Sequence, residues 1–397
     1  MTMAAVIESP AAKIQARSGE KRIAHLDVLH DLHEAEPVWR SLEASQFSTP
    51  YQRFDFLSAW QRHVGTRNGL EPCIIVASDA ERRPQLLLPL TAGAESGVRV
   101  ARFMGGKHAT FNMALWQQDF AASATPADLD ALIHGIRELS SRIDVLAFTR
   151  QPQRWRDLRN PMSLLPHQAS ANSCPLMTFV PGAPPSEHIS NSFRRRLKGK
   201  ERKLQALPGY RYCVTTTDIE IKRVLDAFFT IKPLRMAAQK LPNVFADPGV
   251  EDFLRAACLT PLPDGGHAIE IHAIECDAEV IAIFAGVADG HRFSMMFNTY
   301  TMSENARYSP GLILMRDIVD RYAERGYTSL DLGIGSDDYK RLFCKGDEPI
   351  FDSYLPLSTR GRMAAIGMSS MARAKRIVKQ TPALKRMAQA LRGALHR

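Results

Sequence analysis

The residues best suited to chemistry lie in two short segments of the second half of the chain. The first segment precedes a predicted amphipathic helix and reads Arg307-Tyr308-Ser309-Pro310-Gly311-Leu312. The free N–H groups and the positive dipole end of a helix favour a bound anion, and Arg307 would add a full positive charge. We therefore predict a phosphate-binding site formed by Arg307, Ser309, Gly311 and Leu312. The alternative is ordinary capping of the helix by Ser309 and Pro310.

The second segment follows a short strand predicted over residues 329–332. Lys340 comes after a loop, Gly333-Ile334-Gly335-Ser336, and from there could stabilise a developing oxyanion. Asp331 lies at the C-terminal end of the strand and could act as a general base or orient Tyr339. These three residues are the candidate catalytic set. The alternatives are a surface lysine on a short helix and a buried pair between Asp331 and an arginine.

Three further polar residues of the second half were weighed for binding roles. Arg235 lies at the end of a helix predicted over residues 218–235 and is a candidate for binding an anionic group of the acceptor, unless it is a solvated arginine at a helix end. His267 and His272 share one predicted strand, but their odd spacing puts them on opposite faces, so they do not form a one-sided ligand set. The six cysteines are scattered without a C-x-x-C pair. We predict no metal site.

These residues need a scaffold, and the hydrophobic pattern predicts the same element order, β-α-α-β-β-β-α-β, in each half. The first half has strands at 22–29, 72–78, 85–91, 98–103 and 143–149, and helices at 31–44, 54–64 and after Pro126. The second half has strands at 210–216, 267–276, 279–287, 292–299 and 329–332, and helices at 218–235, 250–259 and 310–325. A basic helix at 190–207 and a strand at 349–357 flank that set. The pattern predicts an α/β (α+β) fold of mixed sheets flanked by helices.

Length and composition restrict the classes of protein to which the chain can belong. The chain has 397 residues, 45% of them hydrophobic and 23% charged, which excludes a wholly disordered, collagenous or disulfide-scaffold protein. The longest apolar stretch, residues 280–288, has nine residues, whereas a membrane helix needs about 20. We expect a leader at 1–20, domains at 21–180 and 181–358, and a cytoplasmic location.

The net charge of +9 is concentrated at the C-terminus. Residues 360–397 contain ten basic and no acidic residues, so subtracting them from 51 leaves 41 basic against 42 acidic residues. Pro382 is expected to divide this tail, residues 359–397, into two helices. Its regularly spaced apolar residues favour contact with an anionic membrane surface at the inner face of the membrane, and a disordered solubilising tail is the alternative.

Several motifs resemble a known family. They are Tyr308-Ser309-Pro310-Gly311-Leu312-Ile313-Leu314, Asp331-Leu332-Gly333, Asp338-Tyr339-Lys340, Phe47-Ser48-Thr49-Pro50-Tyr51 and Phe56-Leu57-Ser58-Ala59-Trp60. They look like the CelD/BcsL-type group of GNAT acyltransferases, which is associated with bacterial cellulose biosynthesis. This group is related to the Fem-type aminoacyltransferases. The resemblance covers roughly residues 21–358.

The resemblance implies two tandem GNAT-like domains and a specific reaction. The reaction would transfer an acyl group from acetyl-CoA to an amine or hydroxyl of a cell-envelope or exopolysaccharide component, or of its precursor. Asn298 and Tyr300 would then face the cleft between donor and acceptor. Lys340 begins a segment similar to the "K-x-x-F" of Fem-type relatives, in which the lysine is placed at the active site. The usual glycine-rich phosphate loop is reduced here to one glycine, and Pro310 removes a donor.

Two other functions stay open. An aminoacyl-tRNA-dependent transferase is favoured by the poor phosphate loop and by the basic run Arg194-Arg195-Arg196-Leu197-Lys198-Gly199-Lys200-Glu201-Arg202-Lys203. The other is a catalytically silent GNAT-like adaptor of a polysaccharide-synthesis assembly. Apart from tRNA, no nucleic-acid partner is expected, because no known binding module is present.

Overall fold

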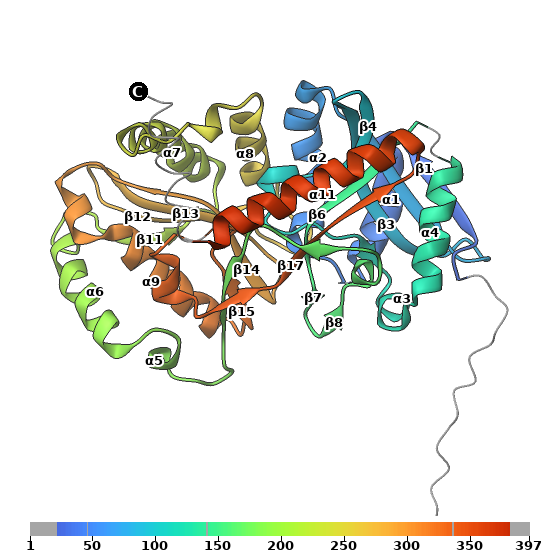
Figure 1. Ribbon diagram of the computed structural model, residues 1–397. Helices are drawn as coiled ribbons and strands as arrows, with labels where there is room; N and C mark the ends of the chain where they lie inside the picture. The colour runs from blue at the N-terminus through green and yellow to red at the C-terminus, as the bar shows by residue number, and fades with distance from the viewer. Residues whose placement is uncertain (1–21, 46, 140–141, 336, 382–397) are drawn as a thin grey trace, which may run out of the picture.

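The computed structural model describes residues 22–381, except 46, 140–141 and 336, and contains two mixed sheets that lie side by side (Figure 1). The first sheet has the strand order β1-β2-β3-β4-β6-β17-β9, with β5 paired to β3. Its strands are β1 (His25–Leu29), β2 (Glu71–Ser78), β3 (Pro84–Glu95), β4 (Val98–Phe103), β5 (Leu115–Trp116), β6 (Val145–Pro152), β9 (Gln168–Ala169) and β17 (Ile350–Pro356). The helices of this half are α1 (Leu32–Glu43), α2 (Phe54–Trp60), α3 (Gln118–Ser123), α4 (Pro126–Leu139) and the late helix α11 (Thr359–Gln380).

The second sheet has the strand order β11-β12-β13-β14-β15-β10-β16. Its strands are β10 (Cys174–Thr178), β11 (Arg211–Val214), β12 (Glu270–Glu275), β13 (Val280–Ala288), β14 (Arg292–Tyr300), β15 (Ser329–Asp331) and β16 (Gly346–Glu348). The helices are α5 (Pro185–His188), α6 (Asn191–Leu204), α7 (Asp218–Ala238), α8 (Val250–Leu259), α9 (Pro310–Glu324) and α10 (Lys340–Phe343). A separate hairpin joins β7 (Arg154–Trp155) to β8 (Leu158–Arg159).

The two sheets repeat one topology. In each, four strands pair antiparallel in spatial order, β1 to β4 and β11 to β14. A helix, α4 or α9, then leads to a strand that pairs in parallel with the last of the four, β6 with β4 and β15 with β14. The repeated order predicted from the hydrophobic pattern is found in both halves. The predicted fold class, mixed sheets flanked by helices, is confirmed.

Local sequence explains how the helices cover both faces of the second sheet. α7 begins with a capping box in which the Thr217 hydroxyl accepts from the Glu220 N–H and the Glu220 carboxylate accepts from the Thr217 N–H. Phe228 of α7 packs in one core, while Ile318 of α9 packs in the other. β13 contributes residues to both cores. The sheet therefore separates α7 and α8 from α6 and α9.

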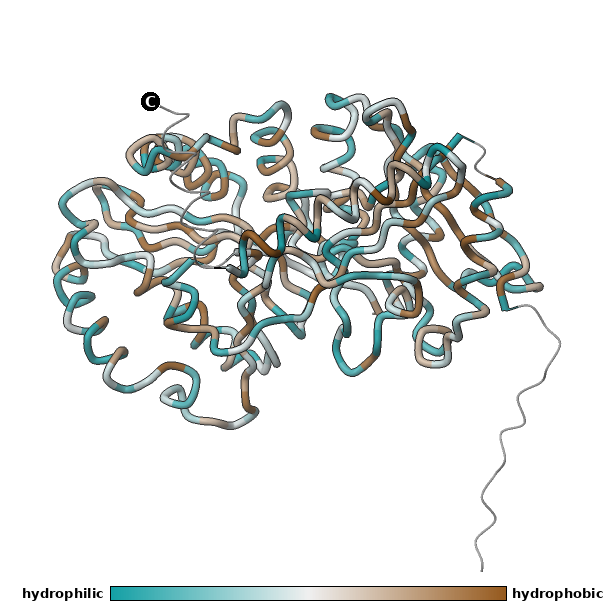
Figure 2. Tube along the Cα trace, viewed as in Figure 1, coloured by the Kyte–Doolittle hydropathy of each residue, from teal (hydrophilic) through white to brown (hydrophobic). Residues whose placement is uncertain are grey.

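The core under α7 and α8 is continuous with the core of the first sheet. The tube in Figure 2 is brown along the strands of both halves, where this core lies. α8 packs on α2, where the rings of Phe253 and Phe56 meet edge to face with centroids 5.3 Å apart. Gly249 permits this approach, because its φ is +78° and a Cβ there would lie 1.9 Å from the carbonyl oxygen of His63. The two halves are therefore in direct apolar contact.

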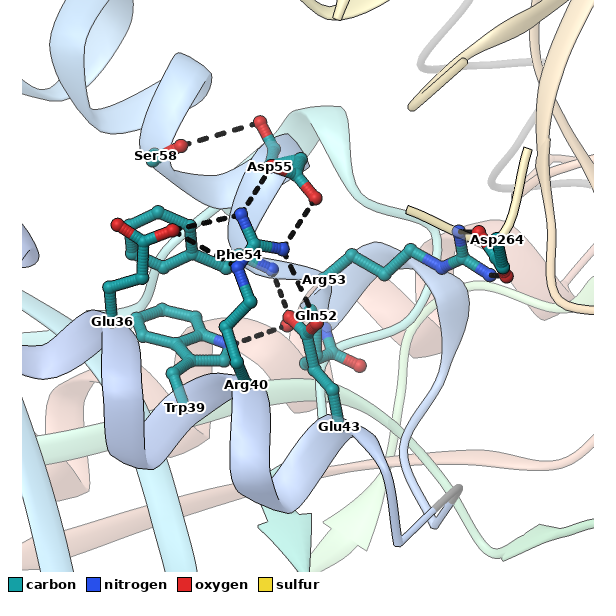
Figure 3. A network of polar contacts seen from close by, with 10 residues as sticks. All are labelled: Glu36, Trp39, Arg40, Glu43, Gln52, Arg53, Phe54, Asp55, Ser58 and Asp264. Atoms are coloured by element: carbon teal, nitrogen blue, oxygen red, sulfur yellow. Dashed lines mark hydrogen bonds and ion pairs between the residues drawn. The ribbon is translucent and has the colours of Figure 1, made fainter. Parts of the chain in front are cut away.

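A polar network holds α1, α2 and the second half together (Figure 3). Arg40 donates to both carboxylate oxygens of Asp55 at 2.7 Å, in the bidentate geometry that arginine favours. Glu43 accepts from the first main-chain N–H of α2, and burial raises the pKa of Glu43 to about 7. Arg53 forms an ion pair with Asp264 of the second half at 3.0 Å.

The two halves also exchange strands. β10 belongs to the range predicted as the first domain but pairs with β15 of the second sheet. β17 belongs to the range predicted as the second domain but pairs with β6 of the first sheet. β10 was not predicted from the sequence, and neither pairing could be predicted, because both partners are far away in the chain. The boundaries at 180 and 358 stay a prediction.

The remaining differences concern the ends of elements and the tail. The helix predicted over 54–64 ends as α2 at Trp60 and continues as a π-helical turn, Gln61–Gly65. The tail begins with α11, whose Ala365 packs against β4 and β6. The predicted leader at 1–20 and the predicted division at Pro382 lie outside the described residues. Within the described part of the chain, no helix is long and apolar enough to cross a membrane. The same residues contain no group of three or more potential metal ligands.

Candidate active site

A cleft of about 710 Å³ lies between the two halves of the molecule. Its walls come from α7, the start of α8, the second half of β14 and the loop after β15, together with residues 107–110 of the first half. Five of the predicted site residues line it: Arg235, Asn298, Tyr300, Tyr339 and Lys340. The other five do not: Asp331, Arg307, Ser309, Gly311 and Leu312.

The cleft opens where β14 and β15 separate. The two strands pair over only three residues each, whereas β14 continues to Tyr300. Near its end, β14 bonds to β13 through the Thr301 N–H, which donates to the Ile281 carbonyl at 2.8 Å. The direction of hydrogen bonding alternates along a strand, so the main-chain groups of Asn298 and Tyr300 point away from β13. They lie on the edge of β14 that β15 leaves uncovered, and we call this the open edge of β14.

Tyr339 and Asn298 meet at this open edge. The Asn298 Nδ2 donates to the Tyr339 hydroxyl oxygen at 3.2 Å. Burial raises the pKa of Tyr339 to about 12, so the phenol keeps its proton at neutral pH. Tyr339 can therefore donate a hydrogen bond or a proton to a group bound in the cleft.

Lys340 is buried, with 4% of its surface exposed. Its ammonium donates to the main-chain carbonyls of Gly333 and Ile334 at 3.1 and 3.3 Å, and lies 3.6 Å from the carboxylate of Asp337. The alternative of a surface lysine is therefore wrong. Lys340 lines the cleft and also holds the loop after β15 in place.

Asp331 is fully buried and lies outside the cleft. Its Oδ1 accepts from the Ser294 hydroxyl at 2.9 Å and from the Gly333 N–H at 3.0 Å. Burial raises the pKa of Asp331 to about 6. Among the described residues, Asp331 bonds to neither Tyr339 nor Lys340, but both Asp331 and Lys340 bond to main-chain groups of Gly333. The roles of base and of direct orienter of Tyr339, predicted from sequence, are not supported by this placement.

The first half of the chain reaches this buried network through Tyr51. The Tyr51 hydroxyl lies 2.8 Å from the Ser294 hydroxyl and 3.0 Å from that of Thr110, which lines the cleft. Burial raises the pKa of Tyr51, which keeps the phenol protonated. A chain of hydrogen bonds therefore connects the wall of the cleft in the first half to Asp331 in the second.

The predicted phosphate site at the start of α9 lies beside the cleft. Ser309 has a left-handed backbone (φ 57°), and its hydroxyl accepts from the Lys200 ammonium of α6 at 2.7 Å. The Leu312 N–H already donates to the Ser309 carbonyl at 3.0 Å, which leaves the Gly311 N–H for an anion. A Cβ at Gly311 would lie 3.3 Å from the Tyr300 ring, so this helix start and the cleft meet at Tyr300.

The two cations near the start of α9, Arg307 and Lys200, differ in their exposure and in their partners. Arg307 is mostly exposed and pairs with Glu304 at 3.2 Å. Lys200 is half-buried and touches Ser309 directly. Lys200 belongs to the basic run noted in the sequence, but no role of its own was predicted for it.

Two cations of α7 line the opposite wall. The Arg235 guanidinium stacks on the Tyr300 ring, with its carbon 3.4 Å from the ring centroid. The Lys232 ammonium, three residues earlier, donates to the Asn298 carbonyl at 2.8 Å, on the open edge of β14. Burial lowers the pKa of Lys232 to about 8. Among the described residues, neither cation forms an ion pair with a carboxylate.

Several residues of the cleft, and of the buried hydrogen-bond network behind it, were not predicted from the sequence. Lys232 shares a helix face with Arg235, and that i,i+3 spacing was a usable signal. Tyr51 lies in one of the family-like motifs. His108 had no signal: its Nδ1 accepts from the Trp60 indole N–H at 3.0 Å, and burial lowers the pKa of His108 to about 4. His108 is therefore neutral and carries its proton on Nε2. Asp337 is the one carboxylate among the described residues of the cleft.

Comparisons with known proteins agree with this fold. Residues 191–341 match the family described as an acetyltransferase (GNAT) domain. That segment contains β14 together with α7 and the loop after β15, which line the cleft on either side of the open edge of β14. No curated protein matches the chain.

The matched segment covers most of the second sheet and its helices, and the first half repeats their topology. The C-terminal domain of a putative lysylphosphatidylglycerol synthetase from Agrobacterium fabrum is 10% identical, with a TM-score of 0.51 over 87% of this chain and 97% of that one. A conserved protein of unknown function from Bacteroides thetaiotaomicron is also 10% identical, with a TM-score of 0.50 over 83% and 99% of the two chains. At such identities the likeness concerns the fold. The GNAT domain supports transferase activity, whereas the CelD/BcsL-type assignment stays a prediction.

Proposed function

We propose that the chain transfers an acetyl group from acetyl-CoA to an amine or hydroxyl acceptor within the cleft between its two halves. The observation that carries this proposal is the open edge of β14, which meets Tyr339 and Lys340 in a cleft of about 710 Å³. Acyl transfer needs a donor held beside an acceptor, and this is the position where two ligands could meet.

The start of α9 fits the phosphates of acetyl-CoA in its chemistry. Lys200 supplies a cation, Ser309 a hydroxyl and Gly311 a free main-chain N–H. The helix dipole adds a further attraction for an anion. From that position, the acetyl end would pass Tyr300 and reach the open edge of β14. The acetyl thioester supplies the activated carbonyl.

The chain's own groups would then assist the transfer. Main-chain N–H groups at the open edge of β14 and the protonated Tyr339 hydroxyl are placed to donate to the acyl oxygen as it gains charge. Asp337, the carboxylate among the described cleft residues, is the candidate to remove the acceptor proton. Neutral His108 carries its proton on the buried Nε2, so it is unsuited to act as that base.

Calorimetric titration of the full chain with acetyl-CoA tests the donor. We expect saturable binding below millimolar concentration and a loss of about tenfold in affinity for Lys200→Gln, because a charge-assisted phosphate contact contributes roughly 1.5–3 kcal/mol. Lys203→Gln, an exposed change on the same helix, is the matched control and should bind as the wild type does. Absence of binding at millimolar acetyl-CoA would exclude this donor.

An aminoacyl-tRNA donor is the second candidate, and one observation favours it. The start of α9 has few free donors, because Pro310 has no N–H and the Leu312 N–H is already bonded. α6 meanwhile exposes Arg195, Arg196 and Lys198. Under this alternative, tRNA would bind the chain and the combined change of these three residues to Gln would weaken binding strongly, whereas acetyl-CoA would not bind.

For the acceptor, we propose a component of the cell envelope or of an exopolysaccharide such as cellulose, or its precursor. The support is the motif resemblance in the sequence. For location, we propose peripheral contact with an anionic membrane through α11. This helix exposes Met363, Ile366, Met371 and Ile377, on the side away from the sheet, and basic residues flank them. An apolar face between cations suits a lipid surface with negative head groups.

A further inference from the structure

We propose that Lys232 and Arg235 form a binding subsite for a phosphate-class oxyanion, so that the acceptor of this transferase is a phosphorylated molecule. We call these two residues the α7 cation pair. The inference rests on the proposed function, because it assigns the acceptor side of the same cleft. Both side chains come from one face of α7 and line the same wall.

Among the described residues, no carboxylate forms an ion pair with either member of the α7 cation pair, and the other cations of the cleft are already held by carboxylates or by main-chain carbonyls. Lys107 pairs with Asp247. Arg150 donates through its Nη1 to the main-chain carbonyls of residues 107 and 109, at 2.9 and 3.1 Å. Lys340 is held by two carbonyls and by a nearby carboxylate. Lys232 bonds to the Asn298 carbonyl and lies 5.7 Å from the centroid of the Phe245 ring, while Arg235 stacks on Tyr300. Asp337 attracts Lys232 electrostatically, but among the described residues it forms no ion pair with it, so the positive charge of the pair is only partly compensated.

The geometry of the pair suits a tetrahedral oxyanion. The Lys232 ammonium has three N–H donors and uses one on the Asn298 carbonyl, which leaves two. The Arg235 guanidinium is held flat against Tyr300, so its fork of donors is fixed in orientation before a ligand arrives. Burial of a lysine without an anion is unfavourable, and a bound oxyanion would remove that cost. The neighbouring wall is apolar, with Val244 and Phe245, and could receive the rest of the acceptor.

This subsite is separate from the proposed site for the donor phosphates. The Tyr300 ring lies between them, with Arg235 stacked on it and Gly311 of the α9 start also against it. A phosphate at the α7 cation pair and a phosphate at Lys200 would therefore belong to two different ligands. The open edge of β14 lies next to the pair, since Lys232 bonds to it directly. An acceptor anchored there would have its reactive group close to the acetyl carbonyl.

Sulfate is the probe, because its charge is constant between pH 6 and 10. Calorimetric titration of the full chain at constant ionic strength should give saturable sulfate binding. Lys232→Gln and Arg235→Gln should each weaken it by about tenfold, while Lys222→Gln, an exposed change on the same helix, should leave it unchanged. The affinity for acetyl-CoA should stay within twofold of the wild type in both cleft variants. Inorganic phosphate should repeat the pattern at pH 8.

A second measurement needs no variant. The wild-type affinity for sulfate should fall three- to tenfold between pH 7 and pH 9, because Lys232 loses its proton there. The other charged and titratable groups that line the cleft with Lys232 are Lys107, His108, Arg150, Arg235, Tyr300, Asp337, Tyr339 and Lys340. Of the variants, Lys232→Gln should lose this pH dependence and Arg235→Gln should keep it.

Three results would overturn the inference. They are the absence of sulfate binding up to 50 mM, equal binding by the wild type and both cleft variants, and an equal loss of sulfate and acetyl-CoA affinity, which would assign the pair to the donor. The test also separates the two proposals. Sulfate binding without acetyl-CoA binding supports the subsite and rejects the donor, whereas acetyl-CoA binding without sulfate binding rejects the subsite alone.

Discussion

The Lys340 ammonium determines the shape of the loop that closes one side of the cleft. It bonds to two consecutive main-chain carbonyls, and Asp331 bonds to the N–H of the same Gly333 from the buried side. The start of the loop is therefore held by Lys340 through its carbonyls and by Asp331 through the Gly333 N–H. Its geometry, rather than a single reactive side chain, is what brings Tyr339 to Asn298.

Lys340→Gln should weaken both the fold and the donor site. It would leave two buried carbonyls without a charged donor, so we expect a loss of about 1–3 kcal/mol in the free energy of unfolding, measured with urea. Acetyl-CoA affinity should fall together with stability. Lys345→Gln, a change at a nearby exposed lysine, should alter neither. Wild-type stability and affinity in Lys340→Gln would reject this role.

The buried carboxyl of Asp331 should make stability depend on pH. Its pKa is raised from 3.8 to about 6 in the folded state, so the folded state binds the proton more tightly and loses stability as the carboxyl ionises. Relative to Asp331→Asn, the wild type should therefore lose roughly 2–3 kcal/mol between pH 4 and pH 7. Urea titrations of both proteins at the two pH values measure this difference, and a constant difference would contradict the raised pKa.

At the level of single residues, five that line the cleft were predicted from the sequence, because polar side chains near strand ends and helix starts are few. It could not predict which of them are buried or paired. The sequence does not tell that Ser294 donates to Asp331, or that the Tyr51 hydroxyl bonds in turn to Ser294. Those contacts join residues that are far apart in the chain.

Among the elements, the separation of β14 from β15 creates the site. β15 is a short strand, and the chain leaves it through Gly333, whose φ is +70°. A side chain there would meet the Met295 carbonyl oxygen of β14 at 2.9 Å. This glycine therefore allows the loop to pass close to β14 before the two strands diverge.

Gly333→Ala should lower the free energy of unfolding by more than backbone strain alone would. A left-handed backbone costs an alanine about 1–2 kcal/mol, and the contact with Met295 adds to this. Gly97→Ala is the matched control, because Gly97 has φ +84° and open space around its Cα. In urea unfolding, Gly333→Ala should be less stable than Gly97→Ala, and it alone should weaken acetyl-CoA binding. Equal effects of the two changes would contradict the account of this turn.

The order of the elements followed from the sequence, since apolar periodicity and capping residues mark each helix and strand locally. The exchange of β10 and β17 between the two sheets did not follow from the sequence. β10 and β17 pair with strands more than 150 residues away in the chain, and pairing of this kind leaves no local signal.

For the whole molecule, the two halves form one body around a shared core, and α11 lies on its outside. One side of α11 packs on the first sheet, while its exposed side is apolar between basic flanks. The charge excess of the chain is therefore carried at least partly by a surface helix. We propose that this charge acts on the location of the protein rather than on its reaction.

The chain should bind vesicles that contain phosphatidylglycerol and not vesicles of phosphatidylcholine alone. Each basic residue near an anionic surface contributes about 1 kcal/mol, so binding should weaken with added salt. Changing Met363, Ile366 and Met371 together to Ser should reduce co-sedimentation several-fold. Ile219→Ser, a change at an exposed apolar residue of α7, should not. Binding that ignores lipid charge, or that survives the triple change, would reject the membrane contact.

A crystal structure of the full chain with acetyl-CoA tests the central claim most directly. The account predicts the phosphates at the start of α9, beside Lys200 and Gly311, and the acetyl carbonyl at the open edge of β14 near Tyr339. The α7 cation pair should remain free of the donor. Density for the donor phosphates at Lys232 and Arg235, or an acetyl group bound outside the cleft, would contradict the account.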